Sequence, residues 1–331
     1  MSKKFTSIST KVYVPLVAIL AFIIIVTVLL GFNNVSEIKK DVYEQTKQRI
    51  DLFYEQALAE KASVGVSNAI TLSFNDNLKT SLIKNDRELA IRTVKDMSKK
   101  FKSDTKFQNI QIHIHDKDMK SFVRSWKPED FGQDLSSFRH TIKEVHASKK
   151  AFAAIEVGDK GLSMRGLAPI MDDKGELVGT IEFMQAFMSV VKDAKKDINA
   201  STLFLLKDSF ASTAKAIANN PKVKNFIIAQ DADTIDKDLV AELDKIDISG
   251  TKECVVGEKY FVSARPIKDF KGEVIAYLVC GKQIDQINAA IESAKTTAFI
   301  QIGLMAGVGI FMVLIIMGII RKAVKQPITD F

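Results

Sequence analysis

Two long blocks of apolar residues constrain the fold more than any other feature of this sequence. Residues 12–32 carry no charge over 21 positions, and residues 298–320 contain Gln301 as their only strongly polar side chain. A helix of about 20 apolar residues crosses the roughly 30 Å hydrocarbon core of a bilayer. The first block is longer than the roughly 7–15 apolar residues of a secretory signal, and no small-residue cleavage site follows it. We therefore predict two uncleaved transmembrane helices.

Positive charge flanks the outer ends of both blocks. The flanking cations are Lys3, Lys4, Lys11, Arg321, Lys322 and Lys325. Because positive flanks stay in the cytoplasm, residues 1–11 and 321–331 are expected inside and residues 33–297 outside. The six flanking cations and Asp330 contribute +5 of the net charge of +7, so the other 41 cations and 39 anions leave the outer region at +2. The basic balance thus indicates topology, and we expect no nucleic-acid partner.

The first part of the outer region, residues 33–106, has a helical composition. It is almost free of Gly and Pro up to about residue 99, and Val35, Ile38 and Val42 begin an apolar stripe at helical spacing. We predict one long stalk helix continuing from the first membrane span. The stripe fits either an exposed helix with scattered apolar residues or the contact of a parallel homodimer.

Residues 107–190 change to a strand pattern, in which Ile110, Ile112 and Ile114 alternate with polar residues. Four further strands are expected at residues 120–126, 151–157, 162–171 and 176–187, separated by Asp- and Gly-rich turns. Between the second and third strands, Asp134 or Ser136 is a candidate N-cap for a helix. This segment is predicted to form one α/β module.

Residues 191–283 repeat this order in a weaker form. Strands are expected at 202–207, 252–256, 259–267 and 273–282, with a mainly helical stretch up to residue 243. The phrases GLAPIMDDKGELVGTIEF and SARPIKDFKGEVIAYLV align as strand, Pro-Ile, charged turn with Gly, and strand, which indicates an internal repeat. Residues 284–297 form a helix leading into the second span. Cys254 and Cys280 are expected on different pleats of non-neighbouring strands, and therefore unpaired.

These elements resemble the double Cache sensory region of bacterial methyl-accepting chemotaxis receptors. The resemblance rests on these words: Phe122-Val123-Arg124-Ser125-Trp126, Asp134-Leu135, Phe138-Arg139, Ile155-Glu156, Gly161-Leu162, Arg165-Gly166, Pro169-Ile170 and Gly179-Thr180-Ile181-Glu182. It implies an α+β fold in which two PAS-like modules, each with an antiparallel five-stranded sheet, are carried by one long helix. Residues 321–331, with Pro327-Ile328, resemble the start of a HAMP linker, so a cytoplasmic signalling part is expected to follow.

Strand register predicts how the polar residues of the first module are arranged. If the turns are tight, Arg165 faces Glu182, Glu156 lies diagonal to Arg165, and Gln111 faces Arg124. One pleat is then apolar and packs on the long helix, while the other is polar. The polar pleat and the helix above it supply the candidate ligand-binding residues: Gln111, His113, Arg124, Trp126, Arg139, Glu156, Arg165 and Glu182. The same pattern also fits a simply solvated face.

Within that set, Arg124 has only a neutral residue opposite it, and a partly buried guanidinium without an anion is costly. We therefore predict a small carboxylate-bearing ligand held by Arg124 with Trp126 as an aromatic wall, and Arg165 as a scaffold for the two glutamates. The order Arg124-Ser125-Trp126 also resembles part of the amino-acid-binding motif of other double Cache receptors, although the tyrosines of that motif are absent.

Catalytic and metal motifs are not apparent. The sequence contains no P-loop, nucleophile elbow, dinucleotide fingerprint or zincin motif, so no enzymatic activity is expected. His113 and His115 share a strand face, but further ligands are not obvious nearby, and we predict neither a metal nor a cofactor.

Together these features predict a multi-pass receptor of the bacterial inner membrane with an extracytoplasmic sensory region. We expect a homodimeric chemoreceptor that signals to cytoplasmic partners. The alternatives are the sensor region of a histidine kinase or diguanylate cyclase, or a structural membrane protein without a ligand.

Overall fold

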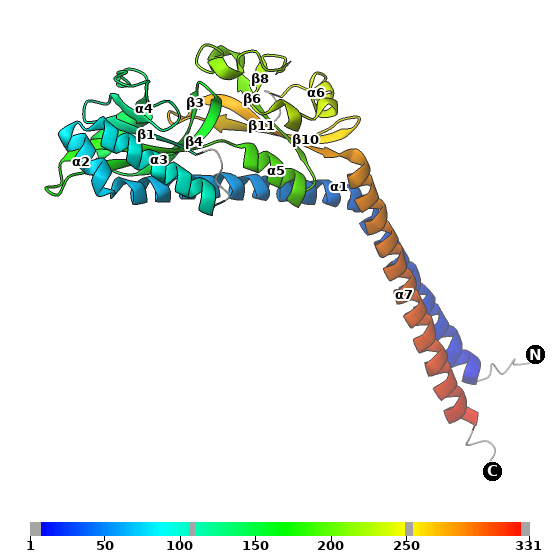
Figure 1. Cartoon of the computed structure of the whole chain (residues 1–331). Helices are drawn as coiled ribbons and strands as arrows, with labels where there is room; N and C mark the ends of the chain where they lie inside the picture. Colours follow the sequence, from blue (N-terminus) through cyan, green and yellow to red (C-terminus); the bar gives the residue numbers. More distant parts are fainter. Residues whose placement is uncertain (1–7, 106–109, 249–253, 326–331) are drawn as a thin grey trace, which may run out of the picture. The chain divides into compact units, whose positions relative to one another are not determined.

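The computed structural model describes residues 8–105, 110–248 and 254–325. The chain divides into two compact units, one of residues 1–46 with 285–331 and the other of residues 47–284 (Figure 1). The first unit contains the apolar blocks, and the second contains both α/β modules. Each unit is described separately.

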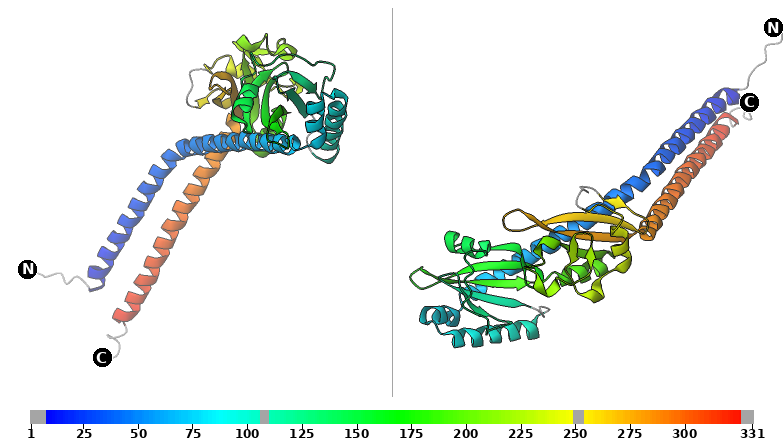
Figure 2. Two further views of the ribbon diagram at one scale, coloured as in Figure 1. Left: turned by 90° about the vertical axis from the view of Figure 1, so that its left-hand side faces the viewer. Right: turned by 90° about the horizontal axis from the view of Figure 1, so that it is seen from above.

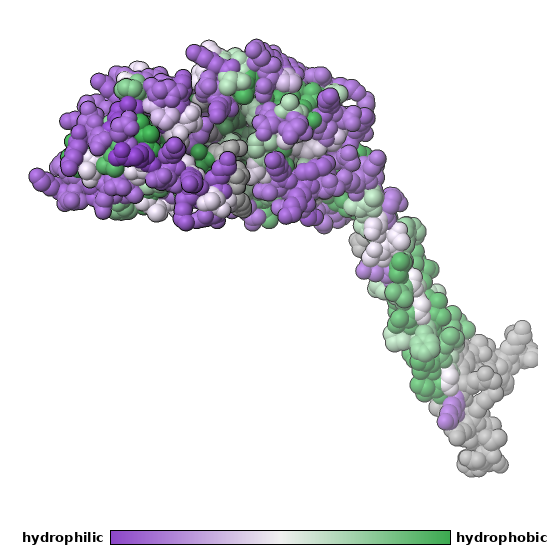
Figure 3. Space-filling model, viewed as in Figure 1, coloured by the Kyte–Doolittle hydropathy of each residue, from purple (hydrophilic) through white to green (hydrophobic). Residues whose placement is uncertain are grey.

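The first unit consists of two helical segments. They are the beginning of α1 (Ile8–Ser73) and almost all of α7 (Ile284–Lys325). The two segments lie side by side, with the rings of Phe32 and Phe299 6.1 Å apart (Figure 2). Among the described residues, one stretch, Ile284–Ile319, is long and apolar enough to cross a membrane, and α1 contributes the shorter apolar stretch Val14–Leu29. The apolar surface of this unit is visible in Figure 3. Pro327-Ile328 lies outside the described residues.

The predicted single stalk helix is wrong beyond Ser73. The chain instead forms α1, then α2 (Asp76–Lys84) and α3 (Arg87–Asp104). Asn75 caps α2 by accepting a hydrogen bond from the backbone N–H of Leu78, and Asp86 caps α3 in the same way. Between them Asn85 adopts a left-handed conformation with φ of 53°, which ends α2. Three asparagine and aspartate side chains therefore interrupt a segment whose composition is otherwise helical.

The first module is built on a five-stranded antiparallel sheet, as predicted. Its strands are β1 (Gln111–Asp116), β2 (Ser121–Arg124), β3 (Phe152–Gly158), β4 (Gly161–Met171) and β5 (Leu177–Gln185), in the order β2-β1-β5-β4-β3. One pleat is apolar and packs against α1, α2 and α3, which confirms the predicted core face. The core residues are Ala69, Leu72, Leu78, Ala90, Val94, Ile112, Ile114, Phe122, Val123, Ala168, Ile170, Ile181 and Phe183.

Helix α1 crosses this sheet in direct backbone contact. A Cβ atom placed on Gly166 of β4 would lie only 2.0 Å from the carbonyl carbon of Gly65 in α1. Beside this crossing, the side-chain amide of Gln185 donates to the carbonyl oxygen of Lys61 at 2.8 Å. Glycine is required at the crossing because any side chain would push the helix and the strand apart.

The second module follows α5 (Met188–Asp197) and contains a six-stranded sheet, so the five strands implied by the resemblance are wrong for this module. Its strands are β6 (Ser201–Lys207), β7 (Lys222–Val223), β8 (Phe226–Ile228), β9 (Val255–Val256), β10 (Tyr260–Lys268) and β11 (Val274–Gln283), in the order β7-β8-β6-β11-β10-β9. The predicted helical stretch up to residue 243 is mostly wrong. It contains short 3₁₀ turns and the small hairpin β7–β8, and its one α-helix is α6 (Lys237–Leu243).

The two modules repeat the same turn in detail. In the β4–β5 turn the carboxylate of Asp172 accepts hydrogen bonds from the backbone two and four residues later, and Asp269 does the same in the β10–β11 turn. Gly175 and Gly272 occupy the same position with φ of 81° and 83°. The internal repeat predicted from the sequence therefore extends to the hydrogen bonds of the turns.

The two cysteines do not form a disulfide bond in the described structure. Cys280 on β11 pairs with Ser263, and the β9–β10 register places Cys254 opposite the same Ser263. The predicted separation onto different pleats is therefore wrong. The strands carrying them are nevertheless separated by β10, and two strand spacings of roughly 9.6 Å exceed the ~7 Å limit for a disulfide.

Candidate ligand-binding site

The polar pleat of the first module lies beneath helix α4 (His140–Ser148) and the loop that precedes it. The helix begins later than predicted, with Arg139 at its N-cap position. Neither Asp134 nor Ser136, the two expected caps, caps this helix; Asp134 instead accepts hydrogen bonds from the backbone and side chain of Ser136. Leu135, Ile142 and Val145 are buried with Leu167 of β4, which fixes this layer over the sheet.

The predicted strand register is shifted by two residues at two strand pairs. Arg165 pairs with Met184 instead of Glu182 for two reasons. The turn is one residue longer than predicted, with the N–H of Asp172 bonded to the carbonyl oxygen of Glu176, and a bulge between Ile170 and Met171 adds the second residue. His113, and not Gln111, pairs with Arg124.

A shift of two residues returns a side chain to the same pleat, so most of the predicted polar and apolar faces are correct. Phe122 is the exception, because the predicted register placed it with His113 on the polar pleat, whereas a bulge in the β1–β2 pairing places it in the apolar core. The predicted diagonal placement of Glu156 and Arg165 is confirmed, because Glu156 pairs with Ser163.

Glu182 lies at the centre of the polar pleat and is completely buried. Its carboxylate receives a short contact from Nη2 of Arg139, and both of its oxygens lie 3.4 Å from Nη1 of Arg165. Burial favours the neutral acid, but the two guanidiniums outweigh this and hold the pKa of Glu182 well below its usual range. Glu182 is therefore an ionised carboxylate inside the protein.

Glu156 forms the second anion of the cluster. Arg139 approaches its Oε2 with Nη2 at 2.9 Å and Nε at 3.1 Å, and Thr141 donates to its Oε1 at 2.8 Å. Nε of Arg165 lies 3.5 Å from the same carboxylate. Burial opposes the charge on Arg139, yet Glu182 and Glu156 raise the pKa of this guanidinium overall. The expected scaffold role of Arg165 fits these contacts, and Arg139 closes the cluster from above.

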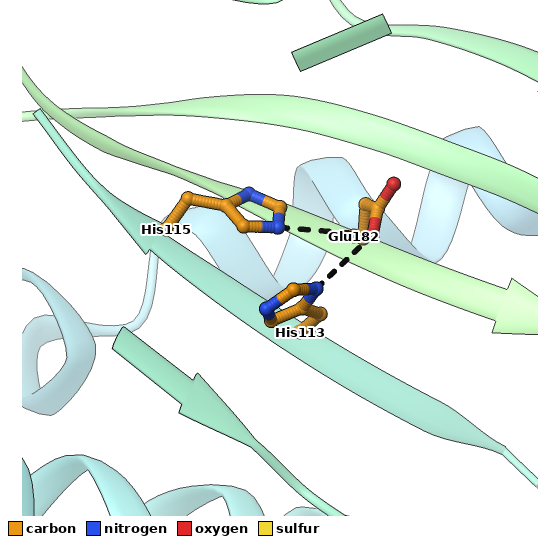
Figure 4. A group of neighbouring side chains, drawn as sticks. All are labelled: His113, His115 and Glu182. Atoms are coloured by element: carbon orange, nitrogen blue, oxygen red, sulfur yellow. Dashed lines mark ion pairs between the residues drawn. The ribbon is translucent and has the colours of Figure 1, made fainter. Parts of the chain in front are cut away.

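Two histidines complete the centre (Figure 4). Nδ1 of His113 lies 3.4 Å and Nε2 of His115 lies 3.7 Å from Oε2 of Glu182. The opposite ring nitrogens are hydrogen-bonded to Ser121 Oγ and Thr180 Oγ1, each at 2.8 Å. Burial lowers the pKa of His113 to about 4 and lowers that of His115 well below its usual value, so both rings are neutral at pH 7.

The unmatched charge predicted for Arg124 does not exist. Its Nη1 lies 2.8 Å from both the carboxylate and the carbonyl oxygen of Asp130, and its Nη2 donates to Gln133 at 2.6 Å. Arg124 therefore holds the loop before α4 in place. Trp126 is partly exposed, and its ring meets the ring of His113 edge-on at 5.7 Å. Gln111 lies at the start of β1, opposite Met184.

Sequence reasoning identified most of this cluster but missed how its members combine. Ser121 and Thr180 were not predicted, and Glu182 was not placed beside the two histidines. The missing information was the pairing of β1 with β5, which sets His113 directly opposite Glu182. The alternation of His113 and His115 was the available signal, but it does not say which strand lies alongside.

Two surface depressions lie away from this cluster. One of about 360 Å³ is lined by residues of α3 and the start of α2, including Arg92 and Asp96, and one of about 200 Å³ is lined by Phe74, Ala151 and their neighbours. No member of the charged cluster lines either of these two depressions.

Comparison with known proteins identifies the class of domain. The family dCache_3, described as a double sensory domain of two-component sensor kinase, matches residues 43–287. The sensor domain of the V. cholerae histidine kinase DctB is similar at 10% identity and a TM-score of 0.45, covering 74% of this chain and 98% of its own. The ligand-binding domain of the Campylobacter jejuni chemoreceptor Tlp3, in complex with L-valine, gives 14% identity and 0.40, with 79% and 97% covered. The comparison with curated proteins gave no match.

Proposed function

Because the chain belongs to the dCache_3 family of double sensory domains, we propose that it is the sensing part of a membrane receptor for a small extracytoplasmic molecule. The family match spans both α/β modules. The apolar stretch Ile284–Ile319 follows them directly and is long enough to anchor them in a membrane. The described part of α1 adds the apolar stretch Val14–Leu29, which supports a first span at residues 12–32.

The output of the receptor is a separate part of the proposal. We favour a homodimeric chemoreceptor, because the short sequence motifs of the first module and residues 321–331 resemble those of that class. A sensor kinase is the second candidate, because the matching family is described by that type of protein. Cysteines introduced singly at Val35, Ile38 and Val42 test the dimer. They should crosslink between subunits in membranes, and uniform absence of crosslinks would contradict it.

The buried charge cluster is the observation that carries the binding site. Arg139, Arg165, Glu156 and Glu182 are all largely removed from water. Removing charges from water costs several kcal/mol per ion, and apolar residues in their place are often neutral or stabilising, on the order of 1–4 kcal/mol. Stability therefore gives little reason to keep four ions beneath α4. Buried and mutually perturbed charges of this kind are typical of functional sites.

Arg139 suggests what such a site would recognise. It belongs to the layer above the sheet, whereas its two carboxylate partners stand on the strands. When this layer lifts, the planar guanidinium becomes available to bind a carboxylate with two parallel hydrogen bonds. Glu156 and Glu182 are then left with Arg165 as their cation and favour a positively charged group. We infer a small carboxylate-bearing ligand, with Arg139 as its fork in place of Arg124 and Trp126 beside it.

Calorimetry on the full chain in lipid nanodiscs tests this proposal. A panel of small carboxylates, with and without an amino group, is titrated into the wild-type protein. Arg139→Lys keeps the charge but loses the bidentate fork, and it should weaken binding by about 1.5–3 kcal/mol. Arg265→Lys in the second module is the matched control and should bind as the wild type does. Equal affinity in Arg139→Lys, or no binding from the whole panel, would count against this site and ligand class.

A further inference from the structure

Oε2 of Glu182 faces two histidines and one arginine. It lies 3.4 Å from Nδ1 of His113 and 3.7 Å from Nε2 of His115 (Figure 4). Nη1 of Arg165 lies 3.4 Å from the same oxygen, and Arg139 contacts Oε1. The three donor atoms lie within 4.8 Å of one another, and all three side chains are buried. Two imidazole nitrogens and a carboxylate oxygen therefore converge on one small volume within β1 and β5.

Nε2 of His115 supplies an independent reason to expect something in that volume. The side chain has no exposed surface, and this nitrogen finds no hydrogen-bond partner among the described residues. A buried polar atom without a partner costs on the order of 1–3 kcal/mol. Its distance of 3.7 Å from Glu182 is too long for a hydrogen bond. A metal ion placed between them would satisfy both atoms.

Two hydroxyl groups orient the histidine rings. Thr180 holds Nδ1 of His115, and Ser121 holds Nε2 of His113, so each ring directs its other nitrogen towards Glu182. A metal-binding histidine usually donates a hydrogen bond from its other ring N–H to an oxygen acceptor. Metal-binding carboxylates are themselves hydrogen-bonded to neighbouring groups. Arg139 and Arg165 serve the carboxylate, and Glu156 offsets one of their charges.

We propose that His113, His115 and Glu182 bind one divalent transition-metal ion, of which Zn²⁺ is the best match. Zinc accepts imidazole nitrogen and carboxylate oxygen at roughly 2.0–2.2 Å, so two ligands of a tetrahedral ion lie roughly 3.4 Å apart. The 3.4 and 3.7 Å separations from Glu182 are close to this value. The site shares Glu182 with the cluster proposed above, but it goes beyond that function because Zn²⁺ alone tests it.

Zinc titration of the full chain tests the inference. The protein, carrying no polyhistidine tag, is stripped with a chelator in nanodiscs and titrated with Zn²⁺ alone by calorimetry, with bound metal counted by elemental analysis. We expect one ion per chain. His113→Gln and His115→Gln should each weaken binding by more than about 100-fold, a larger loss than outer-shell changes cause. His140→Gln, at the start of α4 and outside the cluster, should leave the affinity unchanged.

A fourth variant keeps the test decisive if the histidine variants fail to fold. Thr180→Val retains all three ligands and the shape of the residue but removes the hydroxyl that orients His115, and it should weaken Zn²⁺ binding about 10–100-fold. Protein that has been stripped of metal and then loaded with Co²⁺ should show the visible absorption of a tetrahedral nitrogen–oxygen site. The same treatment of His115→Gln should not produce this absorption. No bound zinc in the wild type, or an affinity unchanged in both Thr180→Val and His115→Gln, overturns the proposal.

Discussion

The two modules share a fold and a strand register but fill the outer face of their sheets in opposite ways. Aligning the repeated turns places Glu182 of β5 at the position of Val279 in β11, and Arg165 of β4 at the position of Val262 in β10. All four side chains are buried. One module therefore buries a carboxylate and a guanidinium where the other buries two valines.

The contrast extends to the neighbouring strand. His113 lies opposite Glu182 in the first module, and Leu203 lies opposite Val279 in the second. The outer face of the second module is an apolar core covered by α6. Its buried residues are Leu203, Leu205, Val223, Ile228, Leu239, Leu243, Ile248, Tyr260, Val262 and Val279. The fold thus does not require charges on this face, and their presence in the first module points to function.

Removing the central anion should give the largest effect. Glu182→Ala leaves Arg139 and Arg165 buried beside one remaining carboxylate, and breaking a buried ion pair in this manner costs about 3–5 kcal/mol. Val279→Ala at the equivalent position removes only apolar volume and should cost about 2 kcal/mol. Thermal melting of the full chain, followed by circular dichroism, compares the two. A smaller loss for Glu182→Ala than for Val279→Ala would contradict the ionised cluster.

Replacing the buried charges of the first module with apolar residues, as in the second module, should change stability by a smaller amount and in the opposite direction. The variant combines Glu182→Val and Arg165→Val with Arg139→Met and Glu156→Leu. Because no charge is left without a partner, stability should be unchanged or rise by about 1–4 kcal/mol. Binding of both carboxylates and Zn²⁺ should be lost. A strongly destabilised variant would indicate that the cluster is retained for folding.

The exposed ion pair of the second module should matter little. Arg265 reaches Asp51 of α1 at 2.7 Å, but more than a quarter of each side chain remains exposed. Such pairs contribute about 0–1 kcal/mol, so Arg265→Met should lower stability by no more than about 1 kcal/mol. Arg165→Met in the first module should cost several times more. Similar melting curves for the two variants would remove this distinction.

The smallest effect concerns the two cysteine thiols, which should react with an alkylating reagent at different rates in the folded chain. Burial raises the pKa of the Cys280 thiol to about 12, although Tyr54 partly counteracts this by hydrogen bonding. The nucleophilic thiolate is therefore scarce at pH 8 and increases only as the pH approaches 12. Iodoacetamide at pH 8 should modify Cys254 and spare Cys280, as read by mass spectrometry of peptides. Rapid labelling of Cys280 in the folded chain would refute its burial.

The sequence was sufficient to predict which face of the sheet a side chain occupies, but not which strand or residue lies next to it. Period-two patterns assign residues to one pleat or the other. A register error of two residues, as occurred at two strand pairs, does not by itself change that assignment. The pairing of β1 with β5 joins segments about 65 residues apart, and no local pattern specifies it. Asp130, which neutralises Arg124, lies in an irregular loop where periodicity carries no information. The helix breaks near Asn75 and Asn85 were not predicted, because the surrounding composition is helical and these two residues were not considered as caps.

The contact of Gly65 with Gly166 has a mechanical consequence. Gly166 follows Arg165 directly in β4, so the strand that carries one member of the charge cluster is also the strand that touches α1. Side chains between a helix and a sheet can normally change rotamer and so accommodate small displacements. At this crossing the two backbones are in direct contact, and no side chain lies between them to do so. We therefore expect a displacement of β4 beside Arg165 to move α1 directly at this crossing.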